Sequence, residues 1–267
     1  MSGLSDRKII VEDAIVNPAR GKRSPNLGPT ALLVSARADV SAICRRLQVL
    51  PETAFPFYAG NLFVHNGRRG ALAIAGPVVG APYAVMMLET LISWGARRIL
   101  FLGWCGALIP EASFGDLIIP TSAFIDEGTS RHYNGAWSGD EVDGCRLFRS
   151  GQERSLPSPR LLDRITAHFK TETPRVHGGP VWTTDGVYRE TAPKVRYYRN
   201  QGALAVEMEV SALFTVGTVR QVAVGAVLVV SDDLSELTWR PGFKTEAFRQ
   251  GRETAMDGML DLCLTES

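Results

Sequence analysis

The stretch Ala205-Val206-Glu207-Met208-Glu209-Val210-Ser211-Ala212-Leu213 organises the rest of the chain. An apolar approach runs into two carboxylates separated by one methionine, and a segment with helical periodicity follows. Glutamates at positions i and i+2 of a strand end point to opposite sides, so we expect one to face a ligand and the other to anchor the loop. The alternative is a helix N-terminus whose acidic residues complement the helix dipole.

Length and charge limit the classes of protein that this chain can belong to. Of its 267 residues, 45% are hydrophobic and 21% charged, and the formal net charge is +1. The length suits one large domain or two small ones, and the near-neutral balance argues against a nucleic acid or a membrane surface as partner. Residues 1–6 are polar and no apolar run approaches the ~20 residues that span a bilayer, so we expect no signal peptide and no membrane span.

The four cysteines, Cys44, Cys105, Cys145 and Cys263, lie far apart in the sequence. They form no Cys-x-x-Cys pair, and no histidine is spaced from them as zinc sites require. We therefore expect reduced, mostly buried thiols in a cytoplasmic protein, and no metal site.

Apolar runs and turn residues divide the chain into alternating strands and helices. We expect an irregular arm over residues 1–29 and one domain over residues 30–267, with long surface loops between 126 and 159. The predicted strands are 31–35, 71–75, 99–102, 116–120, 176–183 and 222–230, and the predicted helices are 40–50, 83–94, 159–170, 192–200 and 243–264. This alternation predicts a mainly parallel α/β sheet with helices on both faces.

Polar or small residues stand where several predicted strands end, namely Ser35, Gly103, Thr184, Glu207 and Asp232. In open α/β sheets, ligands bind beyond the carboxyl ends of the strands. The coincidence therefore predicts a single site to which all these strands contribute.

Several stretches together resemble a known family. They are Gly103–Leu108, Gly115–Pro120, Asp126–Tyr133, Thr184–Tyr188, Val206–Glu209 and Val230–Asp232, and they occur in the family's order. The set resembles the nucleoside phosphorylase family, which includes uridine phosphorylase, hexameric purine nucleoside phosphorylase and the methylthioadenosine/adenosylhomocysteine nucleosidases. The resemblance implies a single-domain, three-layer α/β/α fold with a mixed, partly barrel-like central sheet. It also implies a cytoplasmic enzyme of nucleoside catabolism or purine salvage, assembled as a dimer or a trimer of dimers, with no metal or organic cofactor.

The resemblance assigns roles by position. Glu209 resembles the carboxylate that binds the ribose hydroxyls, Met208 the residue packed under the sugar, and Glu207 a supporting acid. Asp232 matches the acid that protonates or hydrogen-bonds N7 of a purine leaving group, which eases cleavage through an oxocarbenium-like state. The alternative for Asp232 is a capping residue after a strand.

The base-binding residues implied by the resemblance are Val187, Tyr188 and Ser231. Ordinary core packing is the alternative for the aromatic at 188. Asp232 favours a purine-type base, whereas Asp126–Tyr133 is more similar to the uridine-phosphorylase branch, and we give Asp232 more weight because its position touches the leaving group.

The phosphate site departs from the family pattern. Phosphorylases carry Gly-Asp-Pro-x-Arg after the first strand, whereas this chain has Ser35 in place of the glycine and Asp39 in place of the arginine. On the third predicted strand, Phe101 and Trp104 replace an arginine and a small hydroxyl residue. Anion binding needs backbone N–H groups and guanidinium charge, so we expect dianionic phosphate to bind poorly.

Asp39 occupies the position of a nucleosidase glutamate that orients or activates water. We therefore predict an N-ribosyl hydrolase, with Asp39 acting on water, Glu209 on ribose and Asp232 on the base. At the level of single residues, Asp39 could instead cap a helix beginning at Val40, and the indole of Trp104 could fill much of the pocket.

Two other activities are alternatives to hydrolysis. The first is phosphorolysis, with phosphate as co-substrate and an anion site rebuilt by Arg37, Arg20, Arg23 or a neighbouring subunit's arginine. The second is nucleoside binding without catalysis.

Overall fold

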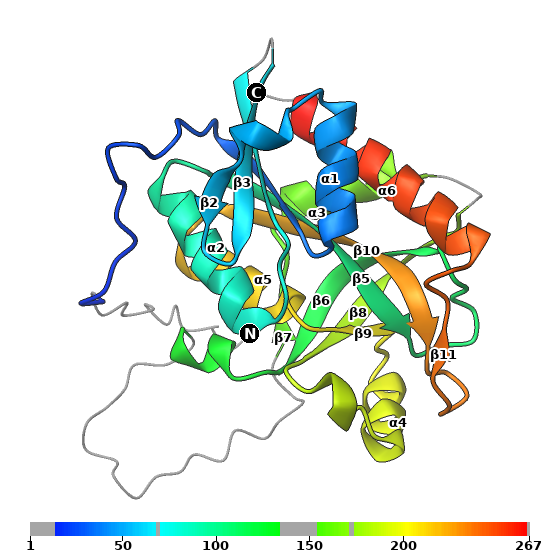
Figure 1. Ribbon diagram of the computed structural model, residues 1–267. Coiled ribbons are helices and arrows are strands. Elements are labelled where there is room, and N and C mark those ends of the chain that lie inside the picture. Colours follow the sequence, from blue (N-terminus) through cyan, green and yellow to red (C-terminus); the bar gives the residue numbers. More distant parts are fainter. Residues whose placement is uncertain (1–13, 68–69, 134–153, 171–173, 266–267) are drawn as a thin grey trace, which may run out of the picture.

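The computed structural model describes residues 14–67, 70–133, 154–170 and 174–265 (Figure 1). The strands are β1 (Thr30–Val34), β2 (Phe55–Phe57), β3 (Gly60–Gly67), β4 (Gly70–Gly76), β5 (Arg98–Ala107), β6 (Leu117–Asp126), β7 (Arg154–Ser155), β8 (Val176–Thr184), β9 (Ala205–Glu207), β10 (Ala223–Asp233) and β11 (Arg240–Pro241). The helices are α1 (Arg37–Arg46), α2 (Ala81–Ser93), α3 (Pro159–His168), α4 (Ala192–Asn200), α5 (Val210–Val219) and α6 (Glu246–Leu264).

The central sheet closes on itself. β5 pairs with β10, β10 with β6, β6 with β8, β8 with β9, and β9 again with β5, which makes a five-stranded barrel. Two of these pairings, β10–β6 and β5–β9, are antiparallel, and the others are parallel. From β5 the sheet extends outward through β1, β4, β3 and β2. The predicted mixed, partly barrel-like sheet is thereby confirmed.

Helices cover the sheet on two sides. α2 and α5 pack Leu88 and Phe214 into one core, and α1, α3 and α6 pack Ile43, Ile165 and Met259 into another. All five side chains are at most 1% exposed, and such burial is the main source of stability in a domain of this size. α4 lies apart from both groups, beside the barrel end of β8 and β9 (Figure 1).

Several boundaries differ from the predicted ones. β5 continues through Gly103–Ala107, beyond the predicted strand 99–102, because its pairing with β10 extends to the end of both strands. α1 ends at Arg46 rather than at Leu50, and α6 begins at Glu246 behind the capping hydroxyl of Thr245 rather than at Phe243. The hairpin β2–β3 was not predicted.

Other predictions about the chain's organisation concern segments and thiols. Residues 14–29 contain neither helix nor strand, whereas residues 1–13, most of the predicted loop region (134–153) and Cys145 lie outside the described residues. Cys44, Cys105 and Cys263 are buried free thiols. Within the described ranges, the helices are too short or too polar to cross a bilayer.

Candidate active site

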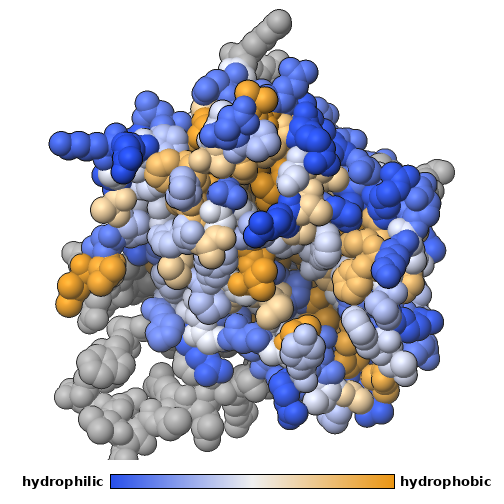
Figure 2. Space-filling view, viewed as in Figure 1, coloured by the Kyte–Doolittle hydropathy of each residue, from blue (hydrophilic) through white to orange (hydrophobic). Residues whose placement is uncertain are grey.

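A cavity of about 660 Å³ opens at the carboxyl ends of β1, β5, β9 and β10. Its lining residues are Ser35, Ala36, Val78, Val79, Trp104, Cys105, Gly106, Val187, Tyr188, Glu190, Val206, Glu207, Met208, Glu209, Ser231, Asp232, Leu234, Trp239 and Phe243. Hydrophobic side chains gather near the centre of the face drawn in Figure 2, whereas its margin is mostly hydrophilic. Ser35, Glu207 and Asp232 therefore meet in one site, as their strand-end positions predicted, while Gly103 and Thr184 are not part of its wall.

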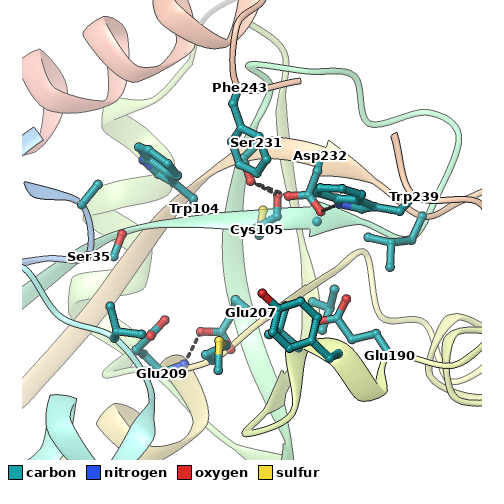
Figure 3. A pocket seen from close by; sticks show the side chains of 18 of the residues that line it. Ser35, Trp104, Cys105, Glu190, Glu207, Glu209, Ser231, Asp232, Trp239 and Phe243 are labelled. Carbon is teal, nitrogen blue, oxygen red and sulfur yellow. Dashed lines mark hydrogen bonds between the residues drawn. The ribbon is translucent and has the colours of Figure 1, made fainter. Parts of the chain in front are cut away.

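Glu207 and Glu209 both line this cavity, which corrects our expectation that they point to opposite sides. The strand ends at Glu207, and Glu209 is the N-cap residue of α5 with φ −131° and ψ −37°, so the alternation of a strand no longer applies there. The Glu207 carboxylate accepts hydrogen bonds from the backbone N–H groups of Glu209 (2.7 Å; Figure 3) and Val210 (2.8 Å) and from the Thr183 hydroxyl. Glu207 therefore both faces the cavity and anchors the loop at the helix N-terminus.

The Glu209 carboxyl is held by the backbone and also lines the cavity. Its Oε1 accepts a 2.6 Å hydrogen bond from the N–H of Gly80, and the backbone of Met208 also hydrogen-bonds this carboxyl. Gly80 has φ +79°, a left-handed conformation that glycine adopts without strain, and this directs its N–H at the carboxylate. Met208 lies beside Glu209 in the same wall.

The two glutamates are hard to ionise together. Burial raises the pKa of Glu207 to about 7, and burial together with the neighbouring Glu207 charge raises the pKa of Glu209 to about 8, in both cases from an ordinary value of 4.5. A pair of carboxyls in one desolvated site favours the state that holds a proton. At neutral pH this part of the cavity, where the resemblance places the sugar, therefore carries a proton that can be shared with ligand hydroxyls.

This pair makes stability depend on pH. Between pH 4.5 and about 8 the folded protein holds protons that the unfolded chain has lost, so the free energy of unfolding falls as pH rises through this window. The limiting slope is ~1.4 kcal/mol per pH unit for each such proton. Urea unfolding at pH 5.5, 6.5, 7.5 and 8.5 should show this decline, and Glu209→Gln should reduce its slope. The exposed Glu236→Gln serves as control, and a slope equal in both variants would contradict the assignment.

Asp232 lies at the end of the cavity where the resemblance places the base. Oδ2 of this residue accepts a 3.0 Å hydrogen bond from Trp239 Nε1, and the Ser231 hydroxyl lies 2.6 Å from Oδ1 (Figure 3). A Cβ on Gly106 would lie only 3.0 Å from Oδ2, so a glycine on β5 leaves the space that Asp232 occupies. Asp233, on the other side of the strand, accepts a hydrogen bond from the Ser235 N–H and is paired with Arg240, and these contacts outweigh burial and lower its pKa. The strand therefore presents one carboxyl to the cavity and fixes the other.

Val187, Tyr188 and Glu190 form the outer part of the same end. Tyr188 lines the cavity at its mouth and is 97% exposed, which excludes the core-packing alternative for its ring. Glu190 follows the short 3₁₀ turn Val187–Arg189 and is half-buried. Burial and the negative charge of Asp232 raise the pKa of Glu190 to about 7. Sequence reasoning missed Glu190 because no motif marks it.

The opposite end is closed by Trp104. Its indole Nε1 donates a 2.8 Å hydrogen bond to Oδ2 of Asp39, whose Oδ1 is paired with the guanidinium of Arg252 on α6. The Arg252 Cζ also lies 5.2 Å from the centroid of the indole ring. Asp39 is only 1% exposed and does not line the cavity, so it lies behind the wall that Trp104 forms. It also does not cap α1, because the helix begins at Arg37 and its N-cap has no side-chain hydrogen bond.

Phe101 does not belong to this end, although we expected it there with Ser35 and Trp104. It is fully buried in the core shared with α2 and α5. Residues 101 and 104 are three apart on one strand, so their side chains face opposite sides of the sheet. This spacing alone could have predicted that the two side chains do not share a site. Ser35 does line the cavity, next to Trp104.

The buried ion pair behind the wall is expected to support the fold. Arg252→Ala leaves the Asp39 carboxylate uncompensated, and we expect it to lower the free energy of unfolding by about 3 kcal/mol in a urea titration. Arg249→Ala, on the same helix and fully exposed in its pairing with Glu246, should leave the midpoint unchanged. Adding Asp39→Asn to Arg252→Ala should restore part of the loss, and a double variant as unstable as the sum of both single variants would contradict a charge-pair origin.

The charge of the cavity follows from these positions. In the part of the chain that the structure describes, the ionisable groups of its wall are four carboxyls, one thiol and one phenol, with no Lys, Arg or His. Those residues also hold no cluster of metal-binding side chains. Such a wall accepts hydrogen bonds from hydroxyls and protonated nitrogens and repels anions. The apolar and aromatic remainder, including Trp239 and Phe243, can cover a planar ring.

Comparisons with known proteins agree with this architecture. The family described as the phosphorylase superfamily matches residues 30–263. The guanosine phosphorylase of Halorubrum lacusprofundi is 26% identical over 163 residues, which span 61% of this chain and 61% of that protein. The uridine phosphorylase structure from Vibrio fischeri ES114 superposes with a TM-score of 0.71 at 21% identity, covering 90% and 93% of the two chains. The AMP nucleosidase structure from Bacteroides thetaiotaomicron VPI-5482 gives 0.66 at 22% identity, covering 88% and 90%. The resemblance predicted from the ordered motifs is confirmed.

Proposed function

The chain belongs to the phosphorylase superfamily of nucleoside phosphorylases and nucleosidases, and on this basis we propose that it hydrolyses the N-glycosidic bond of a purine-type nucleoside. The family makes it an enzyme acting on such bonds. Hydrolysis and a purine base are the parts of the proposal that rest on this chain's own site.

One observation carries the choice of hydrolysis: Trp104, held by Asp39, occupies the end of the cavity where the family resemblance places phosphate. Arg252, which lies behind Trp104, has its charge paired with Asp39 and does not line the cavity. A phosphate dianion would meet an indole and an acidic wall with no cation among its described lining residues, whereas a neutral water molecule avoids this electrostatic repulsion.

The remaining residues suit the developing charges of the reaction. As the C1′–N bond breaks, positive charge builds on the ribose ring, and the carboxyl of Glu209 beside the sugar stabilises it while binding the hydroxyls. Asp232 hydrogen-bonds the nitrogen of the leaving base and stabilises it once protonated. Val187 and Tyr188 cover the base, and the Ser35 hydroxyl is placed to orient water.

Asp39 then acts on Trp104 rather than on water. Since its carboxylate is enclosed by Trp104 and Arg252, we propose that it is a positioning residue that fixes the indole as the wall of the water site. Asp39→Asn keeps an oxygen that can accept the indole N–H, so it should retain hydrolytic activity within about threefold. Asp39→Ala should raise KM more than it lowers kcat, because the untethered indole can enter the space of the substrate.

Phosphorolysis is the competing activity, supported by the name of the Halorubrum relative. The test measures release of base from guanosine, inosine, adenosine and uridine and identifies the sugar product. Each reaction is run in phosphate-free buffer and in about 50 mM phosphate, which would saturate an enzyme whose KM for phosphate is in the millimolar range. We expect equal rates and free ribose. Turnover only with phosphate, giving ribose 1-phosphate, would overturn hydrolysis. Binding of nucleosides without turnover would indicate a non-catalytic protein.

A further inference from the structure

Glu190 is a carboxyl of the cavity wall to which the family resemblance assigns no role. It lies on the same side of the cavity as Asp232 and Trp239, across from Trp104 and Ser35 (Figure 3). Its side chain makes no hydrogen bond or ion pair to any other described residue, unlike the other three carboxyls of the wall. A half-buried carboxyl that has no partner among the described residues and faces a ligand cavity can hydrogen-bond the ligand.

Asp232, unlike Glu190, has hydrogen-bond partners in the protein. Its two oxygens already accept hydrogen bonds, one from Trp239 Nε1 and one from the Ser231 hydroxyl. A carboxylate that these two donors hold in place can accept a further hydrogen bond from a protonated base, and its charge stabilises the charge of that base. The two carboxyls on this side of the cavity thus differ in their contacts, since Asp232 is held by two donors and Glu190 by none among the described residues.

We propose that Glu190 is the general acid of the reaction, which delivers the proton that the leaving base needs, while Asp232 holds the protonated base. This inference rests on the proposed function. As the C1′–N bond breaks, its electron pair passes to the base, and the Glu190 O–H transfers its proton to a ring nitrogen. Water adds to C1′, and the proton that it loses to solvent is recovered by the Glu190 carboxylate, so that the net reaction is nucleoside plus water to base plus ribose.

The surroundings of Glu190 suit a group that carries a proton near neutral pH. Asp232 faces it from β10, and Glu207 and Glu209 face the same cavity from β9 and the start of α5. The ammonium of Lys194 on α4 is paired with Asp126, and Arg240 is paired with Asp233, so neither cation is free to neutralise it. From its own segment, Tyr188 lines the mouth, and Arg189 adjoins it. Burial and the Asp232 charge bring the pKa of Glu190 to about 7.

The test compares guanosine and inosine with their 7-methyl derivatives, whose cationic bases leave without gaining a proton. Wild-type kcat/KM for guanosine should fall about tenfold per pH unit above pH 7, because Glu190 loses its proton there. Glu190→Gln should lower the rate for guanosine and inosine about 100-fold and abolish this fall, yet keep the 7-methyl substrates within about twofold of wild type.

Three outcomes separate the possibilities. If Glu190→Gln lowers the rates for methylated and unmethylated substrates equally, or retains the guanosine rate and its pH profile, Glu190 is not the acid. If the wild-type protein releases base from none of these nucleosides, the proposed function fails as well. Thermal unfolding of Glu190→Gln checks that the variant folds, and Glu236→Gln, exposed in the loop after β10, is the matched control and should behave as wild type.

Discussion

Replacing Glu209 with glutamine is expected to lower kcat/KM for the best nucleoside at least about 100-fold. Glutamine keeps an oxygen for the Gly80 N–H, now at 2.6 Å, so the loop conformation should survive. Glutamine cannot take part in the negative charge that the Glu207–Glu209 pair carries beside its shared proton. The charge-assisted hydrogen bond to ribose hydroxyls is therefore lost, and so is the stabilisation of positive charge on the sugar ring in the transition state. The measurement is steady-state kinetics of base release, with urea unfolding to verify the fold.

The same variant separates the sugar role from a merely structural one. A 2′-deoxynucleoside lacks one of the hydroxyls that Glu209 is proposed to bind, so Glu209→Gln should cost less with it than with the ribonucleoside. Glu236→Gln should match wild type with both substrates. An equal loss for both sugars in Glu209→Gln would contradict direct contact with the hydroxyl, and full activity would contradict any role in the site.

Some parts of this site were predictable because strand ends converge. Ser35, Glu207 and Asp232 lie far apart in sequence, yet a sheet with its carboxyl ends at one edge brings them together. The closed barrel followed from the resemblance rather than from periodicity, since apolar runs alone indicated a mainly parallel sheet. Periodicity cannot predict the antiparallel pairing of β9 with β5, because this pairing joins residues about 100 positions apart in the sequence.

Other parts depend on geometry that no local pattern encodes. Glu209 faces the cavity because the strand ends at Glu207 and Glu209 is itself the N-cap residue of α5. Asp39 has the right residue type for a water-activating acid, but its carboxylate is paired with the guanidinium of Arg252, more than 200 positions later in the chain. Trp239 could have been suspected as an aromatic residue seven positions after Asp232, whereas Glu190 has meaning only through its place beside that carboxylate.

Replacing Asp232 with asparagine is expected to lower kcat for purine nucleosides about 10²–10³-fold. Asparagine presents an N–H₂ group where the protonated base nitrogen needs an acceptor, and it removes the negative charge toward which Trp239 and Ser231 donate. Rapid-quench measurement of base release in a single turnover checks the chemical step directly. Asp261→Asn, exposed on α6, is the matched control and should leave the rate unchanged.

The 7-methyl nucleosides distinguish Asp232 from Glu190. Their base is cationic before the bond breaks, so the charge of Asp232 should bind them in the ground state, and Asp232→Asn should raise their KM. Glu190→Gln should leave both their KM and their kcat near wild type, because no proton is delivered. If Asp232→Asn affected guanosine and 7-methylguanosine only through kcat and to the same extent, Asp232 would not be holding the charged base. If the two carboxyls have separate tasks, Asp232→Asn must raise KM for the 7-methyl substrates, whereas Glu190→Gln must lower kcat only for substrates whose base needs a proton.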